Sequence, residues 1–197
     1  MPRTATARLI LASTSAYRKE LLSRLRLDFE TLSPGVDETE APGVSPDATA
    51  LRLAREKARA GARRRPGSIV IGSDQVADCN GLRLDKPGTR DNAIRQLSAV
   101  SGQSVVFHTA LCVVIAETGR EHTAVVPTTV RFRSLTRDRI ERYIDIEQPF
   151  DCAGSAKAEG LGIALIASIE GPDPTALIGL PLIALTDILT DIGIDVP

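Results

Sequence analysis

The segment Leu9-Ile-Leu-Ala-Ser-Thr-Ser15 decides how the chain begins to fold. Its first four residues form a short apolar run, which is typical of a buried strand. The polar residues after it can cap a helix, and Ser15 is placed to be the N-cap of a helix that carries Leu21, Leu22 and Leu25. The segment therefore predicts a strand that leads through a polar turn into a helix.

Strand and helix signals alternate along the rest of the chain. We expect strands at Phe29–Leu32, Ser68–Val76, Val105–Ala116, Thr123–Phe132 and Ile163–Ile169, and helices from an Asp47 cap to about Arg65, over Asp91–Val100, over Arg137–Ile146 and from Pro181 to Gly193. Residues 33–47 are rich in proline, glycine and acids and predict a loop. The two β-branched segments joined at Gly119 predict a long antiparallel hairpin, so the pattern favours a mixed sheet in an α/β fold.

Composition narrows the class of protein. The 197 residues suit one domain, and we expect residues 1–197 to form it without a separable linker. Lysine and arginine total 24 against 25 acids, and aromatic residues make up only 3%, which argues against binding of nucleic acid.

The cysteines and the apolar runs indicate the compartment. Cys79, Cys112 and Cys152 are odd in number and contain no C-x-x-C pair, so a disulfide framework or a cysteine zinc site is not expected. The run after Arg8 is too short for a signal-peptide core, and Ile163–Ile169 is too short to span a bilayer. We therefore expect a cytoplasmic protein with no membrane partner.

Polar residues at the first turn are candidates for anion binding. Ser13, Ser15 and Arg18 lie where a helix N-terminus offers free N–H groups and a partial positive charge, an arrangement that suits a triphosphate. Simple helix capping beside a surface arginine is the alternative.

Two further clusters carry acids. Asp37 and Glu38 lie in the proline-rich loop, where paired carboxylates can hold a divalent cation or simply be solvated. Asp74 follows an apolar strand in Ile71-Gly-Ser-Asp-Gln75, the position where α/β sheets bind ligands. Lys57 either snorkels along its helix or reaches a phosphate, and Lys86 lies in a loop. Together these groups are suited to phosphate chemistry, with cations neutralising oxygens while a carboxylate positions water.

A series of segments resembles the Maf family from end to end. They are Leu9–Ser15 with Arg18, Val36-Asp-Glu38, Arg55-Glu-Lys-Ala58, Ile71–Gln75, Lys86-Pro87, Ser101-Gly102 and Gly179-Leu-Pro181. The resemblance implies an elongated Maf/ITPase-like α/β fold with two lobes around a central cleft, usually in a homodimer. It also implies hydrolysis of a nucleoside triphosphate to the monophosphate and pyrophosphate with a divalent metal cation, Mg²⁺ or Mn²⁺.

The same resemblance implies roles for individual residues. Asp74 would be the proton acceptor and a metal-side carboxylate, and Glu38 would support the metal or the water. Contacts to the triphosphate would come from Ser13, Ser15, Arg18, Lys57 and Lys86. Asp85 stands where the family usually has glycine, and its charge beside Lys86 weakens the phosphate role of that lysine.

Three residues resemble the branch of the family that hydrolyses 7-methyl-GTP. Gln75 and Glu159 stand where the dTTP/UTP branch has threonine and glutamine, and Tyr17 stands where the 7-methyl-GTP enzymes tend to have tryptophan. Methylation at N7 makes guanine cationic, which favours stacking on an aromatic face. A carboxylate such as Glu159 can accept hydrogen bonds from both N–H groups of the guanine edge, whereas glutamine would leave one donor unpaired.

Two other functions stay open on the sequence alone. The first is a dTTP/UTP pyrophosphatase of the same family, against which Gln75 and Glu159 argue. The second is a non-catalytic inhibitor of septum formation, which the family's name suggests and which the retained charged residues disfavour.

Overall fold

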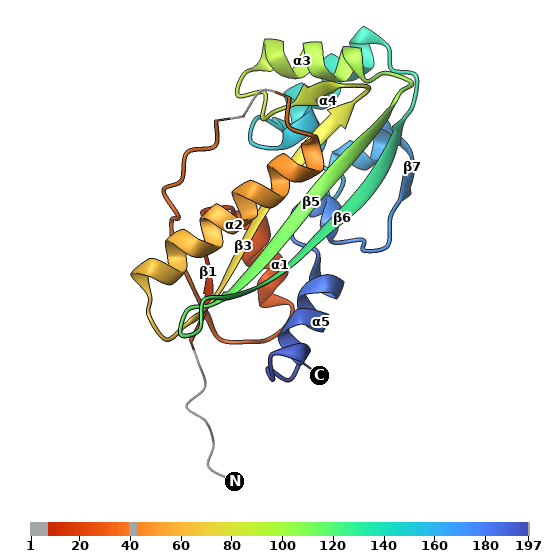
Figure 1. Cartoon of the computed structure of the whole chain (residues 1–197). Helices are drawn as coiled ribbons and strands as arrows, with labels where there is room; N and C mark the ends of the chain where they lie inside the picture. Colours follow the sequence, from red (N-terminus) through yellow and green to blue (C-terminus); the bar gives the residue numbers. More distant parts are fainter. Residues whose placement is uncertain (1–7, 40–42, 197) are drawn as a thin grey trace.

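A seven-stranded mixed sheet forms the centre of the molecule (Figure 1). The computed structural model describes residues 8–39 and 43–196. The strands are β1 (Leu9–Leu11), β2 (Phe29–Thr31), β3 (Ile69–Cys79), β4 (Leu82–Leu84), β5 (Ser104–Ile115), β6 (Arg120–Phe132) and β7 (Ile166–Glu170). Along the sheet the order is β2-β1-β3-β5-β6-β7, and β4 pairs with β3. Because β2, β1 and β3 are parallel and the remaining pairs are antiparallel, the predicted mixed α/β architecture is confirmed.

Helices cover both faces of this sheet. They are α1 (Ala16–Ser23), α2 (Pro46–Arg64), α3 (Arg90–Ala99), α4 (Arg137–Glu147) and α5 (Leu182–Asp191), with short 3₁₀ turns η1 (Ala153–Ser155), η2 (Leu161–Leu165) and η3 (Ala176–Ile178). Successive strand residues point to opposite faces. Leu9 and Leu11 accordingly pack in one core with leucines of α1 and α5, while Ile10 packs on the other face beside Ala62 of α2.

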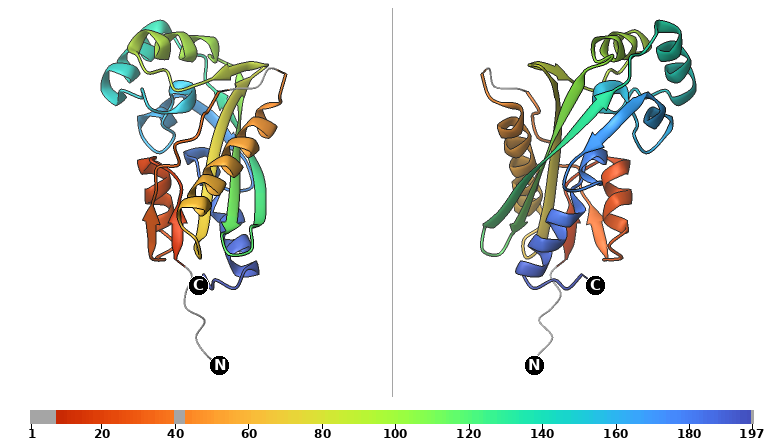
Figure 2. Two further views of the ribbon diagram at one scale, coloured as in Figure 1. Left: turned by 60° about the vertical axis from the view of Figure 1, so that its left-hand side comes forward. Right: turned by 90° about the vertical axis from the view of Figure 1, so that its right-hand side faces the viewer.

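The two ends of the long strands carry different helices. Figure 2 shows α3 and α4 gathered at one end of β5 and β6, and α1 and α5 at the other. A separate apolar core, which includes Leu97, Ile140 and Ile144, joins α3 and α4 to the strands at their end. This division gives the elongated, two-lobed shape that the family resemblance implies.

One helix start was predicted wrongly. The N-cap of α2 is Ser45, not Asp47, and Pro46 occupies the first turn. Proline is favoured there because its fixed φ suits a helix and its missing N–H has no partner in the first turn. Of the loop expected at 33–47, residues 40–42 lie outside the described part of the chain, as do residues 1–7 and 197.

The last strand was also predicted wrongly at its start. Leu161–Leu165 forms the 3₁₀ turn η2, and strand β7 begins only at Ile166. A Cβ on Gly162 would lie 2.4 Å from the carbonyl oxygen of Lys157, so the chain folds back tightly on itself at this glycine. The apolar run is therefore interrupted by a turn that its composition does not reveal.

Candidate functional site

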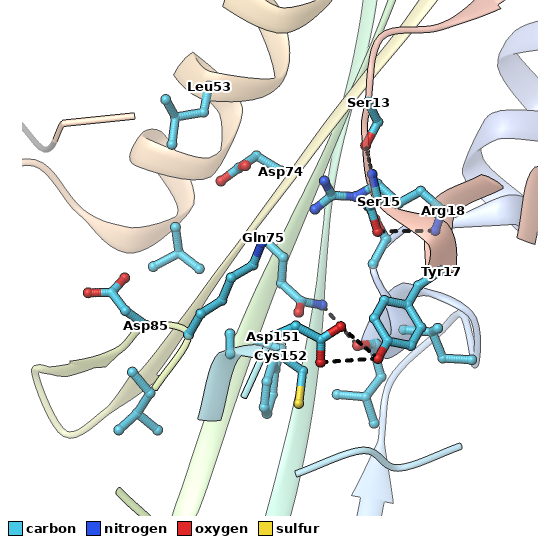
Figure 3. Close-up of a pocket in the computed structure, with 18 of the residues that line it drawn as sticks. Ser13, Ser15, Tyr17, Arg18, Leu53, Asp74, Gln75, Asp85, Asp151 and Cys152 are labelled. Carbon is cyan, nitrogen blue, oxygen red and sulfur yellow. Dashed lines mark hydrogen bonds between the residues drawn. The ribbon is translucent and has the colours of Figure 1, made fainter. Parts of the chain in front are cut away.

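A cavity of about 1020 Å³ lies between the two lobes, and all ten residues predicted for the site line it. They are Ser13, Ser15, Tyr17, Arg18, Glu38, Lys57, Asp74, Gln75, Lys86 and Glu159. Figure 3 shows this cavity, with Arg18 and Asp74 at one side and Tyr17 and Asp151 at the other. The structure therefore gathers groups from the turn after β1, from α1, α2 and β3, and from three loops into one place.

The turn after β1 carries two serine hydroxyl groups that accept hydrogen bonds from the backbone and can still donate their own hydrogens to a ligand. Ser13 Oγ accepts from the backbone N–H of Ser15 at 3.1 Å, and Ser15 Oγ accepts from the N–H of Arg18 at 3.4 Å, which confirms Ser15 as the N-cap. Each hydroxyl uses an oxygen lone pair in these bonds and keeps its own hydrogen. Both can donate to an anion at the N-terminus of α1, where the helix dipole favours negative charge.

Arg18 is held by a residue far along the chain. Its Nε donates to the carbonyl oxygen of Gly179 at 2.8 Å, and the buried Ser73 hydroxyl lies 2.9 Å from the same oxygen. Gly179 has φ +123°, a conformation that side chains rarely adopt. The glycine thus turns its carbonyl toward the site and orients the guanidinium, which points toward Asp74 (Figure 3).

Lys57 connects the two candidate catalytic carboxylates. Its Nζ lies 2.6 Å from Glu38 Oε1 and 2.6 Å from Asp74 Oδ1. Lys57 is only 5% exposed and Asp74 only 7%, so their charges are paired inside the protein rather than in solvent. The Lys57 side chain reaches into the cavity, and its contact with a phosphate stays a prediction.

Gly72 explains how α2 comes close enough for this contact. A Cβ at Gly72 would lie 2.3 Å from the carbonyl oxygen of Ala54 and 2.6 Å from the backbone nitrogen of Ala58. Only glycine permits such an approach of helix backbone to strand backbone. Because Lys57 precedes Ala58 and Asp74 follows Gly72 by two residues, the close packing brings their side chains together.

The charged groups of the site shift one another's pKa values. Partial burial raises the pKa of Glu38, but the hydrogen bond from Lys57 and the positive charges of Lys57, Lys86 and Arg18 outweigh it, and the pKa is lowered. Burial lowers the pKa of Arg18, against the opposing influence of Asp74 and Glu38. One side of the cavity is therefore a compact set of cations interleaved with two carboxylates.

The structure revises the argument about Asp85. Its carboxylate accepts from Arg83 Nε at 2.7 Å, so an arginine compensates the charge beside Lys86. Lys86 lines the cavity and lowers the pKa of Glu38 through its charge. Asp85 is therefore paired with Arg83, and Lys86 can still bind an anion in the cavity.

The other side of the cavity is built differently. The Tyr17 hydroxyl donates to the Asp151 carboxylate, and the Gln75 amide nitrogen donates to Thr109 Oγ1 at 2.8 Å and to the carbonyls of Ala176 and Leu177 at 3.0 Å. Because the side-chain NH₂ group of Gln75 is bound in this way, its side-chain carbonyl oxygen is the atom that can accept a hydrogen bond from a ligand. Glu159 lines both this cavity and a smaller adjoining one of about 370 Å³.

The acid pair suits a hard divalent cation. Glu38 and Asp74 both pair with the Lys57 ammonium, so a cation held between their oxygens would take the place of that ammonium. Mg²⁺ is commonly held by one or two carboxylates together with water and substrate phosphates. Within residues 8–39 and 43–196 no group of three or more His, Cys, Asp or Glu side chains forms a fuller metal cage.

Sequence reasoning missed two residues of this region. Gly179 was noted only within a family-like segment, and nothing local in the sequence signals that its carbonyl binds Arg18, 161 positions away. Asp151 was not singled out, because its contact with Tyr17 spans 134 positions. Both contacts come from the tertiary fold.

Comparison with known proteins establishes the family. The family model described as "Maf-like protein" matches residues 8–192, and the chain belongs to this family. In the described part of the chain no helix is long and apolar enough to cross a membrane.

Several curated relatives are similar over nearly their whole length. A protein of Methylobacillus flagellatus named 7-methyl-GTP pyrophosphatase is 57% identical, with 95% of this chain and 98% of that protein covered. Proteins of the same name from Aromatoleum aromaticum (56% identical; 97% and 98% covered) and Ralstonia nicotianae (54%; 93% and 95%) are similar too. Among solved structures, that of a HAM1 protein from Coxiella burnetii is a distant likeness, with 15% identity, a TM-score of 0.49, and 94% and 98% covered.

Proposed function

We propose that this chain hydrolyses 7-methyl-GTP to 7-methyl-GMP and pyrophosphate with the help of a divalent cation. The observation that supports this function best is the polarity of the cavity of about 1020 Å³: Arg18, Lys57 and Lys86 surround two carboxylates on one side, and Tyr17 and Glu159 lie on the other. Relatives that share more than half of their residues with the chain are named for this reaction.

The triphosphate would bind at the N-terminus of α1. The hydroxyls of Ser13 and Ser15 and the guanidinium of Arg18 supply donors there, and Lys86 supplies positive charge from the opposite lobe. Arg18 is oriented by the Gly179 carbonyl before substrate arrives, so little reorganisation is needed. These groups would hold the phosphates on either side of the bond that breaks.

Asp74 would accept the proton of the attacking water. The water oxygen bonds to phosphorus, the phosphoanhydride bond between the α and β phosphates breaks, and pyrophosphate leaves. Lys57 holds Asp74 and Glu38 in position at 2.6 Å and can turn toward the developing phosphate charge. A Mg²⁺ or Mn²⁺ ion held by Glu38 and Asp74 would neutralise phosphate oxygens and polarise the reacting groups.

The base would be recognised at the other side of the cavity. Tyr17 offers an aromatic face to the cationic methylated ring, and Glu159 offers two acceptor oxygens to the N1–H and N2–H₂ edge. Gln75 contributes its carbonyl oxygen, since its NH₂ group is bound to Thr109 and to η3. The side-chain oxygens of Glu159 and Gln75 are hydrogen-bond acceptors. They match the N–H donors of guanine better than the carbonyl oxygens on the edge of a pyrimidine.

Four further expectations accompany this function. We propose that residues 1–197 act as one domain, that two copies associate as a homodimer, that no nucleic acid is bound and that the protein works in the cytoplasm. Light scattering on the purified protein tests the homodimer directly, and a monomer at micromolar concentration would refute it.

A nucleotide panel tests the proposed function. Pyrophosphate release is measured for 7-methyl-GTP, GTP, dTTP, UTP and CTP with Mg²⁺, with Mn²⁺ and with EDTA. We expect the highest kcat/KM for 7-methyl-GTP and no release with EDTA. A preference for dTTP or UTP would assign the chain to the pyrimidine branch, and no turnover of any nucleotide would favour a non-catalytic role.

A further inference from the structure

The Asp151 side chain holds the Tyr17 ring in place through a hydrogen bond. The Tyr17 hydroxyl lies 3.1 and 3.3 Å from the two side-chain oxygens of Asp151 and donates to them (Figure 3). Burial and Asp151 raise the pKa of Tyr17 against the opposing influence of Lys157, so the hydroxyl acts as a donor at neutral pH. Asp151 therefore limits the rotation of the ring on which the base is expected to stack.

A lysine approaches the same ring. Lys157 Nζ lies 5.9 Å from the Tyr17 ring centroid, 3.9 Å from Asp151 Oδ1 and 3.8 Å from Glu147 Oε1. The Lys157 side chain is 19% exposed, and Lys157 is not among the residues that line the cavity, although Tyr17 and Asp151 are. The ammonium thus contacts the ring from outside the cavity lining.

Helix α4 holds the loop that carries this lysine. The Lys157 N–H donates to the Tyr143 hydroxyl at 3.1 Å, and the Leu161 N–H donates to Glu147 Oε2 at 2.8 Å. Gly162 packs directly on the Lys157 backbone. Because both ends of the segment are bound, the positions of Lys157 and Glu159 are set before a ligand arrives.

The charges around the ring leave an excess of negative charge facing the cavity. The Lys157 ammonium lies near two carboxylates, those of Glu147 and Asp151, and the cavity is lined by Asp151 and by a further carboxylate, Glu159, but not by Lys157. A cationic base entering the cavity meets this excess, whereas a neutral guanine of the same shape does not respond to it. The Asp151 side chain is 61% exposed, so solvent and salt weaken its field without removing it.

We propose that Asp151 is a specificity-determining residue of this site, which orients the Tyr17 ring and supplies carboxylate charge that favours a cationic, N7-methylated purine over its neutral counterpart. The positive charge of Lys157 partly cancels the negative charge of Asp151 and so weakens its attraction for a cationic base. The inference rests on the proposed function, since it assigns the discrimination between 7-methyl-GTP and GTP. Tyr17 has a smaller ring than tryptophan, but its hydroxyl can bind Asp151. The ring on which the base would stack is therefore held in one orientation.

Paired variants test the inference through the ratio of kcat/KM for 7-methyl-GTP to that for GTP. Asp151→Asn keeps the shape and an acceptor for Tyr17 but removes the charge, and we expect the ratio to fall about two- to fivefold, the range for one solvent-exposed charge near a cation. Lys157→Met removes the opposing charge, and we expect the ratio to rise about twofold. Tyr17→Phe frees the ring and should lower the ratio. Asp138→Asn, which removes an exposed acid paired with Arg142 outside the cavity, should leave it unchanged.

Salt and product binding complete the test. The difference between the wild-type ratio and that of Asp151→Asn should shrink at 0.5 M NaCl, because screening acts on charge and not on packing. Calorimetry with 7-methyl-GMP and GMP measures base discrimination without turnover, and thermal unfolding confirms that each variant is folded.

Specific outcomes would overturn the inference. These are an unchanged ratio in Asp151→Asn, equal losses on both nucleotides, or a fall in both Asp151→Asn and Lys157→Met. If the wild-type protein hydrolyses neither nucleotide while its preference for 7-methyl-GMP depends on Asp151, the proposed function fails and the base-recognition role stands.

Discussion

Replacement of Lys57 by methionine separates the electrostatic role of this lysine from its packing role. The side chain is 5% exposed and its ammonium lies 2.6 Å from Asp74, itself 7% exposed, and 2.6 Å from the more exposed Glu38. Methionine preserves most of the side-chain volume, so the main loss is that of the charge. Asp74 is then left as a buried carboxylate without its ammonium partner.

The size of the effect follows from the burial of each partner. Removing one member of a fully buried pair costs about 3–5 kcal/mol, whereas an exposed partner contributes about 0–1 kcal/mol. Asp74 borders an open cavity that water can enter, so we expect Lys57→Met to lower the free energy of unfolding by about 2–3 kcal/mol. For a domain of this size that corresponds to a fall of about 4–12 °C in Tm.

Thermal and urea unfolding measure this loss. Lys19→Met, at an exposed position of α1, is the matched control and should change the free energy of unfolding little. The double variant Lys57→Met/Asp74→Asn should recover part of the stability, because the buried carboxylate charge is removed and only the more exposed Glu38 lacks its partner. Added Mg²⁺ should raise the Tm of Lys57→Met more than that of the wild type, because the cation no longer competes with the ammonium. A change below about 1 kcal/mol in Lys57→Met, or a double variant less stable than Lys57→Met, would refute the reasoning.

Four further predictions follow from the site and its surroundings. Gly72→Ala should destabilise the protein by about 1–3 kcal/mol and lower activity, because its Cβ would meet α2 backbone; native-like unfolding and kinetics would contradict this. Glu159→Gln should reduce kcat/KM for 7-methyl-GTP far more than for dTTP, and equal losses on the two substrates would remove its base-reading role. Since the folded-state pKa of Glu38 is depressed, its ion pair stabilises the native state above the unfolded pKa and loses this effect as pH falls through the folded pKa. The stability difference between wild type and Glu38→Gln should therefore shrink from about pH 7 to about pH 3.5, and a difference independent of pH would argue against the pairing. Burial raises the pKa of Cys112 to about 12, so this thiol should resist alkylation in the native protein at pH 8, as mass spectrometry of labelled peptides can show.

Local sequence signals were sufficient for the first turn and for the hairpin. Ser15 caps α1 as its position predicts, and the β-branched segments around Gly119 form β5 and β6, because short-range preferences and tertiary packing agree there. The strand predicted at Ile163 failed because the tight contact at Gly162 overrides the apolar pattern. Composition could not show that contact.

The sequence singled out residues that line one cavity, but it did not predict their geometry. All ten candidates line one cavity, yet the sequence could not show that Lys57 bridges the two carboxylates or that Arg18 rests on Gly179. Such contacts join segments many positions apart and depend on the close approach at Gly72. Residue types indicate the chemistry, whereas the packing of α2 on β3 sets the distances.

The most direct test of the account is product analysis of 7-methyl-GTP incubated with Mg²⁺ and either the wild-type protein or Asp74→Asn. The account predicts that the wild type forms 7-methyl-GMP and pyrophosphate in equal amounts, and that the folded Asp74→Asn variant forms them at least about a hundredfold more slowly. Release of 7-methyl-GDP and phosphate, or an Asp74→Asn variant as active as the wild type, would contradict it.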